Sequence, residues 1–279
     1  MNGDLADQNS IDNAVSTTQP DEFYNLGAMS FVPESWRSPM MTADITGLGA
    51  LRCLEAIRKH APECKFYQAG SSEQYGKVRD VPQTEKTPFH PRSPYGCAKV
   101  MGYNLVRHYR HAYKLHACNG ILFNHESERR GHNFVTRKIT MGLGKILRGE
   151  TDRLVMGNID SERDWGHAKD YVYGMWLMLQ QEKPDDFVLA TCEKHSVREF
   201  IEKAFYLKGF EIEWKGEGVN EIGYDKHSGK EYIFIDSKYY RPAEVELLIG
   251  DSTKAKTMLG WKPQITFEKL VHKMVVHDC

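Results

Sequence analysis

Lys65-Phe-Tyr-Gln-Ala-Gly-Ser-Ser-Glu73 and Ser93-Pro-Tyr-Gly-Cys-Ala-Lys99 are the two stretches that decide the fold. The first is a short apolar run that ends in glycine and polar residues, which is typical of a buried strand of a parallel sheet. The second opens a long helical pattern, with Ser93 as N-cap and Pro94 in the first turn. A strand followed by a helix in this way is the repeating unit of a layered α/β fold.

The same alternation continues on both sides of these stretches. A strand is expected at residues 22–28 and a helix at residues 46–60, before the strand that begins at Lys65. A third strand is expected at residues 117–123, after the helix that begins at Ser93. This order predicts a doubly wound parallel sheet with helices on both faces.

The second half of the chain is more mixed. The pattern predicts an amphipathic helix at residues 164–180, strands at 186–190 and 231–235, a helix after the capping box of Ser196 and Glu199, and a final helix that follows Ser252 and stops at Gly260. We therefore expect a smaller mixed α/β lobe. The nucleotide-binding lobe would cover residues 1–123, with roughly 162–185 returning to it, and the second lobe would cover mainly 124–279.

Composition excludes several classes of function. The formal net charge is -1, so no field strong enough to attract nucleic acid or an anionic membrane is expected. The longest apolar runs are far too short to span a bilayer, and the first residues do not resemble a signal peptide. The six cysteines form no Cys-x-x-Cys pair, which favours free thiols in the cytoplasm. No metal site is expected, because His108, His111, His116 and His125 lack a carboxylate or thiol at ligand spacing.

Tyr95 and Lys99 are the candidate catalytic pair. Residues i and i+4 share one face of a helix, and a nearby ammonium favours the ionised form of a phenol whose ordinary pKa is about 10. Taken alone, such a pair is an ordinary solvated helix face. In a doubly wound sheet, however, ligands sit at the carboxyl ends of the strands, so Ser71 and Glu73 would meet the start of this helix. The sequence therefore predicts that a hydroxyl, a carboxylate, a phenol and an ammonium converge.

Seven blocks of sequence carry a resemblance to one family. They are Phe66-Tyr-Gln-Ala-Gly-Ser-Ser-Glu-Gln-Tyr-Gly76, Pro91-Arg-Ser-Pro-Tyr95, Asn119-Gly-Ile-Leu-Phe-Asn-His-Glu-Ser127, Asn133-Phe-Val-Thr-Arg-Lys-Ile139, Arg163-Asp-Trp-Gly-His-Ala-Lys-Asp-Tyr171, Tyr239-Tyr-Arg-Pro-Ala-Glu-Val245 and Leu259-Gly-Trp-Lys-Pro263. Together they resemble the GDP-mannose 4,6-dehydratases of the extended short-chain dehydrogenase/reductase family. The resemblance runs from about Gly3 nearly to the end of the chain.

The resemblance implies a role for each catalytic residue. Tyr95 would take the proton of the sugar O4 while hydride leaves C4, and Lys99 would support Tyr95 and bind the cofactor ribose. Glu73 would remove the acidified C5 proton and assist loss of the C6 hydroxyl, and Ser71 would hydrogen-bond O4. Hydride would return to C6, so that GDP-mannose becomes GDP-4-keto-6-deoxymannose. An epimerase would not need the carboxylate.

The resemblance also implies binding residues, a cofactor and partners. NADP would contact the cofactor-binding set, which is Asp4, Leu5, Leu26, Gly27, Ala28, Ser30, Tyr95, Lys99, His125 and Arg130. GDP-mannose would contact the substrate-binding set, which is Asn124, Lys138, Arg163, Arg241 and Glu244. Guanidinium groups suit the diphosphate because they bind phosphate through two parallel hydrogen bonds. A homo-oligomer, dimer or tetramer, is also implied.

The chain departs from the family pattern at several positions. Ser71 replaces a threonine, Phe31 a histidine, Glu128 a proline and Met41 a tyrosine. None of these changes removes Tyr95, Lys99 or Glu73.

The glycine-rich loop that holds a dinucleotide pyrophosphate at a helix N-terminus is absent from the sequence. Gly47 and Gly49, and likewise Gly142 and Gly144, are interpreted as helix-packing glycines. The segment 3–5 corresponds to the end of the family's third strand. The resemblance therefore implies an incomplete Rossmann-type sheet, truncated at its N-terminus, which would bind NADP poorly and turn over little GDP-mannose.

Two other classes of function stay open from the sequence. The chain could be a different nucleotide-sugar dehydratase or epimerase. It could also be a catalytically incompetent remnant that acts only in binding, since the intact catalytic residues do not exclude this.

Overall fold

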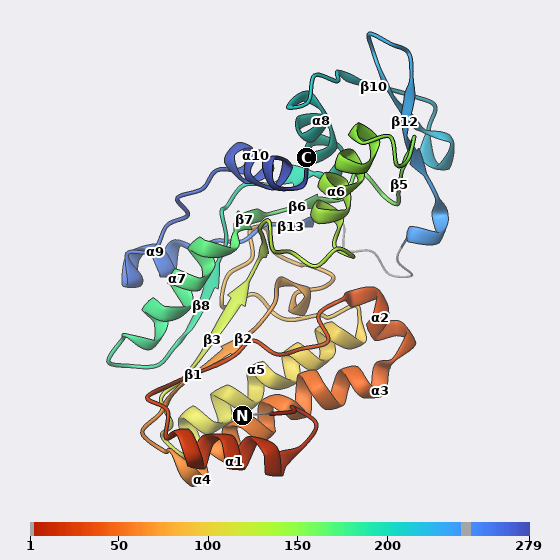
Figure 1. Ribbon diagram of the computed structural model, residues 1–279. Coiled ribbons are helices and arrows are strands. Elements are labelled where there is room, and N and C mark those ends of the chain that lie inside the picture. Colours follow the sequence, from red (N-terminus) through yellow and green to blue (C-terminus); the bar gives the residue numbers. More distant parts are fainter. Residues whose placement is uncertain (1–2, 241–246) are drawn as a thin grey trace.

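The computed structural model describes residues 3–240 and 247–279, and its first lobe is built on a four-stranded parallel sheet (Figure 1). In sheet order the strands are β1 (Glu22–Asn25), β2 (Lys65–Ala69), β3 (Ala117–Leu122) and β8 (Asp186–Leu189). Every pairing between neighbours is parallel. The predicted doubly wound sheet is confirmed, with the first two strands and the helices between them in the expected order.

Helices cover both faces of this sheet (Figure 1). One face carries α1 (Gln8–Thr18), α4 (Gly49–His60) and α5 (Pro94–Ala112), and the other carries α7 (Ala168–Leu179) and α9 (Thr253–Leu259). Successive strand residues point to opposite faces, so Phe66 packs with α1, α4 and α5 whereas Tyr67 packs with α7. The carboxyl ends of the strands are thereby held between two rigid helical layers.

A broken helical connection follows β1. It consists of α2 (Val32–Arg37), α3 (Pro39–Thr42) and a π-helical turn (Ala43–Leu48) that leads into α4. The helix expected at residues 46–60 therefore begins as π-helix. A Cβ on Gly47 would lie 3.0 Å from the sulfur of Met101 in α5, which supports its interpretation as a packing glycine.

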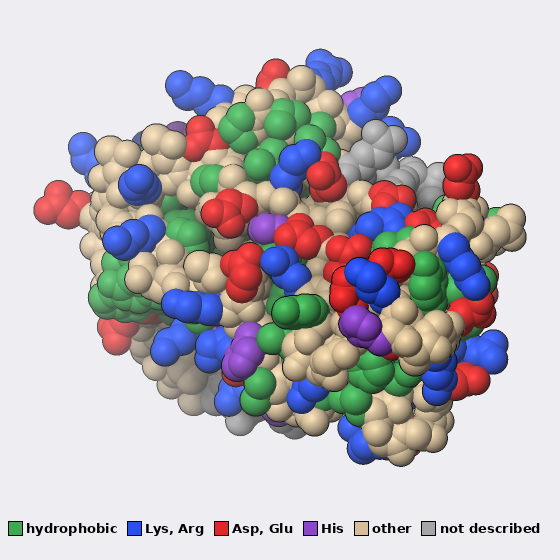
Figure 2. Space-filling view, turned by 90° about the horizontal axis from the view of Figure 1, so that it is seen from above, with side chains coloured by type: hydrophobic (Ala, Val, Ile, Leu, Met, Phe, Trp, Pro, Cys, Tyr) green, Lys and Arg blue, Asp and Glu red, His purple; other side chains and the backbone are tan. Residues whose placement is uncertain are grey.

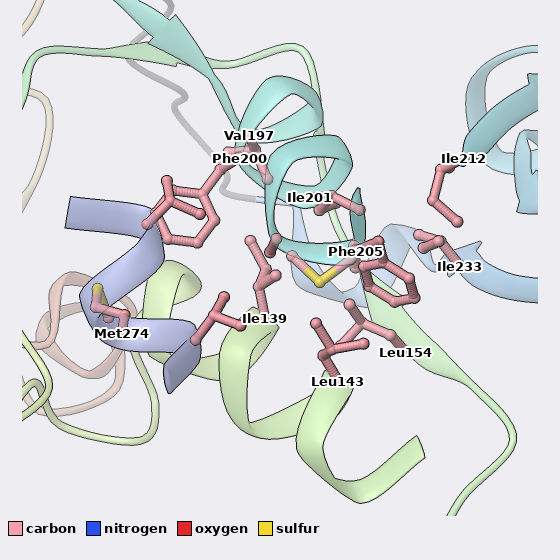
Figure 3. Packing of buried hydrophobic residues seen from close by; sticks show 14 of the residues in the cluster. Ile139, Leu143, Leu154, Val197, Phe200, Ile201, Phe205, Ile212, Ile233 and Met274 are labelled. Carbon is pink, nitrogen blue, oxygen red and sulfur yellow. The ribbon is translucent and has the colours of Figure 1, made fainter. Parts of the chain in front are cut away.

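The second lobe contains a mixed sheet and three helices. Its strands, in sheet order, are β10 (Ile212–Lys215), β11 (Ile222–Asp225), β12 (Glu231–Ile235) and β5 (Leu154–Met156). Its helices are α6 (Val135–Leu147), α8 (Val197–Tyr206) and α10 (Phe267–Asp278). Figure 3 shows their apolar side chains meeting in one core, with Ile139 from α6, Phe200 from α8 and Met274 from α10. The predicted smaller mixed lobe is confirmed.

Short strands lie between the two lobes. β4 (Asn124–Glu126) pairs in parallel with β7 (Trp165–His167), and β6 (Glu162–Arg163) lies between β9 (His195–Ser196) and β13 (Leu247–Leu248). Single 3₁₀ turns occur at Ser72–Gln74, Gly218–Asn220 and Ser237–Tyr239. β4 directly continues the path of β3, so the chain leaves the first sheet and enters the second lobe at the carboxyl end of that strand.

Several predicted boundaries are wrong. The helix expected at 164–180 begins only at Ala168, because Trp165–His167 form β7 and the Asp164 carboxylate accepts backbone N–H groups of Thr191 and Cys192. The strand expected at 22–28 ends at Asn25, and the strand expected at 117–123 is one residue shorter. The segment 3–5 forms no strand.

The predicted helix caps are confirmed at two of three positions, and the predicted last helix is wrong. Ser93 and Ser196 cap their helices as predicted. Ser252 precedes α9 without capping it by its side chain, and the helix that it begins is not the last. α10 follows, capped by Thr266, with its apolar residues at helical spacing.

Figure 2, which views the second lobe from above, shows acidic and basic side chains mixed across the face. All six cysteines are free. Within residues 3–240 and 247–279, no helix is long and apolar enough to cross a bilayer, and no cluster of three His, Cys, Asp or Glu side chains could hold a metal ion.

Candidate active site

The turn after β2 positions the first two candidate residues. A Cβ on Gly70 would lie 2.6 Å from the carbonyl oxygen of Gly120, so only glycine lets the chain pass β3 at this point. Ser71 then begins a 3₁₀ turn through a capping box: its hydroxyl accepts the N–H of Glu73 at 3.3 Å, and its own N–H donates to Gln74 at 2.8 Å. These bonds fix the direction in which the chain leaves the sheet.

The start of α5 lies directly against this turn. The Ser93 hydroxyl accepts the N–H of Gly96 at 3.0 Å, which fixes the first turn of the helix. A Cβ on Gly96 would lie 2.8 Å from the backbone oxygen of Glu73, so the close approach depends on glycine. As the sequence predicted, the Tyr95 helix and the Ser71–Glu73 turn meet at one place.

Tyr95 and Lys99 are both buried in the arrangement. Burial raises the pKa of Tyr95 to about 12, while its hydrogen bond with Ser71 acts in the opposite direction and the charge of Glu73 raises it further. The Lys99 ammonium donates to the carbonyl of Ala69 at 2.7 Å and lies 5.6 Å from the centre of the Tyr95 ring. Burial lowers the pKa of Lys99 to about 8. The lysine is thus tied to the end of β2 as well as placed near the phenol.

A cavity of about 540 Å³ opens over these residues and continues toward the second lobe. It is lined by the predicted catalytic set and by many of the predicted binding residues: Leu26, Ala28, Ser30, Ser71, Glu73, Tyr95, Lys99, Asn124, His125, Arg130, Lys138 and Arg163. The residues come from the segments that follow β1 and β2, from α5, β4, β6 and α6, and from the loop between β4 and α6. This is the edge of a doubly wound sheet at which ligands bind.

His125 forms part of the wall below the phenol. One ring nitrogen, Nδ1, lies 2.8 Å from the carbonyl of Phe123, and the ring stacks on Tyr171 with the centroids 4.9 Å apart. Burial lowers the pKa of His125 to about 4, so the ring is neutral near pH 7. A neutral ring that donates from Nδ1 presents Nε2 as an acceptor.

The far end of the cavity is basic and aromatic. Arg163 is buried and donates to the carbonyl of Glu162 at 2.8 Å. The Lys138 ammonium lies 3.8 Å from the centre of the Tyr239 ring, and burial lowers its pKa. A guanidinium and an ammonium in a half-buried cleft can bind a phosphate-bearing ligand.

Some predicted residues do not line the cavity. Asp4 and Leu5 lie outside it, and Gly27 sits between the lining residues Leu26 and Ala28. The Leu5 side chain packs on Gly27 and Gly49, and its carbonyl accepts from Arg52 at 2.8 Å. Arg241 and Glu244 lie outside the described residues.

Other lining residues were not predicted as site residues. They include Phe31, Phe134, Trp165 and Tyr239. Phe134, Trp165 and Tyr239 lie within the sequence blocks that carried the family resemblance. Their position next to polar site residues was the one feature of the sequence that could have indicated that they line the cavity.

The comparison with known families matches the chain over residues 1–274 to the family described as GDP-mannose 4,6 dehydratase. A GDP-mannose 4,6 dehydratase of Dictyostelium discoideum is 54% identical over 278 residues, which cover 99% of this chain and 78% of the relative. The GDP-mannose 4,6 dehydratase of Homo sapiens is 53% identical, with 99% of this chain and 75% of the relative covered.

Solved structures support the same fold. RMD from Pseudomonas aeruginosa, complexed with NADPH, superposes with a TM-score of 0.84 at 21% identity and covers 99% of this chain and 87% of its own. UDP-glucose 4-epimerase of Thermotoga maritima gives a TM-score of 0.82 at 23% identity, with 99% and 82% covered. At these identities the likeness shows the fold alone, whereas the sequence matches are close enough to show that the chain belongs to the GDP-mannose 4,6-dehydratase family.

Proposed function

We propose that the reaction of this active site is the dehydration of GDP-mannose to GDP-4-keto-6-deoxymannose, with NADP as the cofactor and a glycine-rich loop required to hold the pyrophosphate of NADP. One observation carries the proposal. A single cavity joins the Ser71, Glu73, Tyr95 and Lys99 cluster to a basic end suited to a nucleoside diphosphate, in a chain 54% identical to a GDP-mannose 4,6 dehydratase.

The first proton transfer is the task of Tyr95. Its phenolate would take the proton from the sugar O4 as C4 becomes a ketone, and the Ser71 hydroxyl would hydrogen-bond the same oxygen. NADP, when bound, supplies the chemistry of accepting hydride from C4 and giving it back at C6. Lys99 would hydrogen-bond the cofactor ribose from its buried position at the end of β2.

The second proton transfer is assigned to Glu73. A ketone at C4 makes the C5 proton acidic, so a carboxylate can remove it and then help the C6 hydroxyl to leave as water. This step separates a dehydratase from an epimerase, which does not need this carboxylate. The close approach of the Glu73 backbone to Gly96 holds the turn against the start of α5, and Glu73 and Tyr95 line the same cavity.

The remaining assignments divide the cavity into two halves. We propose that Asn124, Lys138 and Arg163 bind the GDP moiety, together with Arg241 and Glu244. Leu26, Ala28, Ser30, His125 and Arg130 would form the cofactor half, with Asp4, Leu5 and Gly27 at its border. These residues fit NADP, because the neutral His125 ring offers a hydrogen-bond acceptor to an amide N–H of the cofactor.

The two halves would correspond to two functional lobes. Residues 1–123, with 162–185 returning, would form the NADP lobe, and residues 124–279 mainly the GDP-sugar lobe. We also propose a homo-oligomer, either dimer or tetramer, and a cytoplasmic location, which the six free thiols support.

Ligand selectivity tests the proposed substrate. GDP-mannose should raise the melting temperature more than UDP-glucose or dTDP-glucose does, because the basic end was assigned to GDP. Lys138→Ala should reduce the GDP-mannose shift, whereas Lys145→Ala, a control on the same helix outside the cavity, should leave it unchanged. Equal shifts with all three nucleotide sugars would overturn the assignment.

A further inference from the structure

Tyr171 fills a space that Gly166 leaves open beside His125. In the parallel pairing of β4 with β7, His125 lies opposite Gly166. A Cβ on Gly166 would lie 2.4 Å from Cε2 of Tyr171, so the absence of a side chain admits the tyrosine ring. The ring stacks on His125 at an interplanar angle of 18°, with the centroids 4.9 Å apart. An aromatic ring from α7 thus supports a residue that lines the cavity.

The Tyr171 ring is itself fixed by its other neighbours. Trp261 contacts it edge-on, with the centroids 5.7 Å apart and the planes at 81°. The Trp261 indole N–H donates to the Asp170 carbonyl at 2.8 Å. The Asp170 carboxylate accepts the backbone N–H groups of Gln264 and Ile265 at 2.9 and 3.0 Å. The segment after α9 therefore braces the first turn of α7, where the ring is fully buried.

The His125 ring is held at two points. Its Nδ1 lies 2.8 Å from the carbonyl oxygen of Phe123, and a carbonyl oxygen can only accept, so Nδ1 carries the proton. The stack on Tyr171 fixes the ring plane in which that bond forms. Because burial keeps the ring neutral near pH 7, Nε2 is left as an acceptor on a residue that lines the cavity.

We propose that Tyr171 is a positioning residue that acts through His125. It holds the imidazole as the Nδ1–H tautomer, so that Nε2 accepts an N–H of the nicotinamide carboxamide of NADP. The inference rests on the proposed function, in which His125 belongs to the cofactor half of the cavity. A ring that is fixed before the cofactor binds loses little freedom on binding, so the carboxamide meets an acceptor of set direction. The orientation of the nicotinamide then depends on a residue outside the cavity lining.

Nitrogen NMR of the 279-residue chain tests the tautomer without any cofactor. In protein with ¹⁵N-labelled histidine, each ring nitrogen reports whether it carries a proton, and the spectrum of His125→Gln assigns the signals. The parent should show a single Nδ1–H tautomer at pH 7. Tyr171→Phe should keep it, because among the described residues the tyrosine hydroxyl has no hydrogen-bond partner. Tyr171→Leu should show a mixture of both tautomers, because the ring plane is no longer fixed.

Two further variants make the comparison specific. Tyr173→Leu, at an exposed tyrosine of the same helix, is the matched control and should leave the tautomer unchanged. Tyr171→Met fills the same space with a flexible side chain, should also mix the tautomers, and guards against loss of folding in Tyr171→Leu. An Nε2–H tautomer in the parent, or a single Nδ1–H tautomer that persists in Tyr171→Leu or Tyr171→Met, would overturn the proposal.

A cofactor analogue tests the acceptor. The 3-acetylpyridine form of NADP has a methyl group in place of the carboxamide NH₂, so it cannot donate. In the chain joined to a segment that carries the glycine-rich loop, the parent and Tyr171→Phe should bind NADP about fivefold more tightly than the analogue, the contribution of one hydrogen bond. Tyr171→Leu should lose this preference and keep its melting-temperature shift with GDP-mannose. Equal affinity of the parent for the two dinucleotides would overturn the proposal.

The two measurements also separate this proposal from the function on which it rests. A protein with the predicted tautomers and the predicted preference for NADP that makes no dehydrated sugar would support Tyr171 and reject the dehydratase. Normal product formation with unchanged tautomers in Tyr171→Leu and Tyr171→Met would reject the role of Tyr171 alone.

Discussion

Tyr95 and Glu73 line the same cavity, yet the proposed reaction gives them different protons. In the chain joined to a segment that carries the glycine-rich loop, Tyr95→Phe should lower turnover by about two to four orders of magnitude, because no general base remains for the O4 proton. Glu73→Gln should still allow some reduction of NADP, detected by the absorbance of the reduced nicotinamide, but should yield little 6-deoxy product. Normal product formation by Glu73→Gln would remove this carboxylate from the mechanism.

Lys99 combines a functional role with a cost in stability. Its folded-state pKa of about 8 lies below the ordinary value of 10.5. Below about pH 8 the ammonium is charged in both states, so its burial lowers the free energy of unfolding by the full amount. Above about pH 10.5 the amine is neutral in both states, and this loss of stability disappears. Lys99→Met, of similar length, should therefore raise the melting temperature at pH 7 by a few degrees and by less at pH 10, while product formation falls.

A melting curve of each protein at the two pH values checks the Lys99 prediction. Lys59→Met, on the more exposed last turn of α4, serves as the control and should change little. A lower melting temperature of Lys99→Met at pH 7 would mean that the bond to Ala69 outweighs the cost of burying the charge.

At the scale of elements, the contact between α5 and the turn after β2 sets the geometry of the site. Gly96→Ala would place a methyl group 2.8 Å from the Glu73 carbonyl and so force the helix and the turn apart. We expect turnover to fall by about tenfold or more, because small displacements of reacting groups are costly. Gly102→Ala is the matched control in α5, since its Cβ would meet Ala50 at an ordinary 3.5 Å and alanine favours helix.

Kinetic and stability measurements on the same two variants distinguish this account from a general loss of folding. Gly102→Ala should keep its activity and be at least as stable as the parent. Gly96→Ala should lose activity well before it loses its circular dichroism. Equal activity of the two variants would show that the contact with Glu73 does not position the carboxylate.

The elements also show where the sequence was sufficient. The strand Lys65–Ala69 and the helix Pro94–Ala112 followed from local rules, an apolar run and a capped N-terminus, so they could be predicted. Trp165–His167 could not, because it is a strand only through pairing with β4, which lies far away in the sequence. The last helix was missed although Phe267, Leu270 and Met274 stand at helical spacing, because Gly260 and Pro263 suggested that regular structure had ended.

In the candidate site, too, some features could be predicted from the sequence and others could not. That Ser71, Glu73, Tyr95 and Lys99 line one cavity followed from topology, since strand ends and helix starts meet at one edge of a parallel sheet. The bond of Lys99 to the Ala69 carbonyl depends on tertiary distances that no spacing rule contains. The stacking of Arg130 on Phe134 depends on the conformation of an irregular loop, so it could not be predicted from the sequence either.

At the scale of the whole molecule, the edge of the first sheet at β1 bears on the proposed NADP site. β1 pairs with β2 on one side, and within residues 3–240 and 247–279 no strand pairs with its other edge. No Gly-x-x-Gly-x-x-Gly loop, the motif whose helix N-terminus usually holds a dinucleotide pyrophosphate, occurs within these 279 residues. The described residues that we propose for GDP binding, Asn124, Lys138 and Arg163, all line the cavity. Binding of GDP-mannose and turnover can therefore be separated experimentally.

The most direct test of the central claim follows deuterium from C4 of GDP-mannose in the presence of NADP. The measurement is made on the 279-residue chain and on the same chain joined to a strand–loop–helix segment that carries the glycine-rich loop. The account predicts that the joined chain forms GDP-4-keto-6-deoxymannose with the deuterium at C6, and that the 279-residue chain forms little of it. Unchanged GDP-mannose, a C4 epimer, or product whose deuterium has been lost to water from the joined chain would contradict the account.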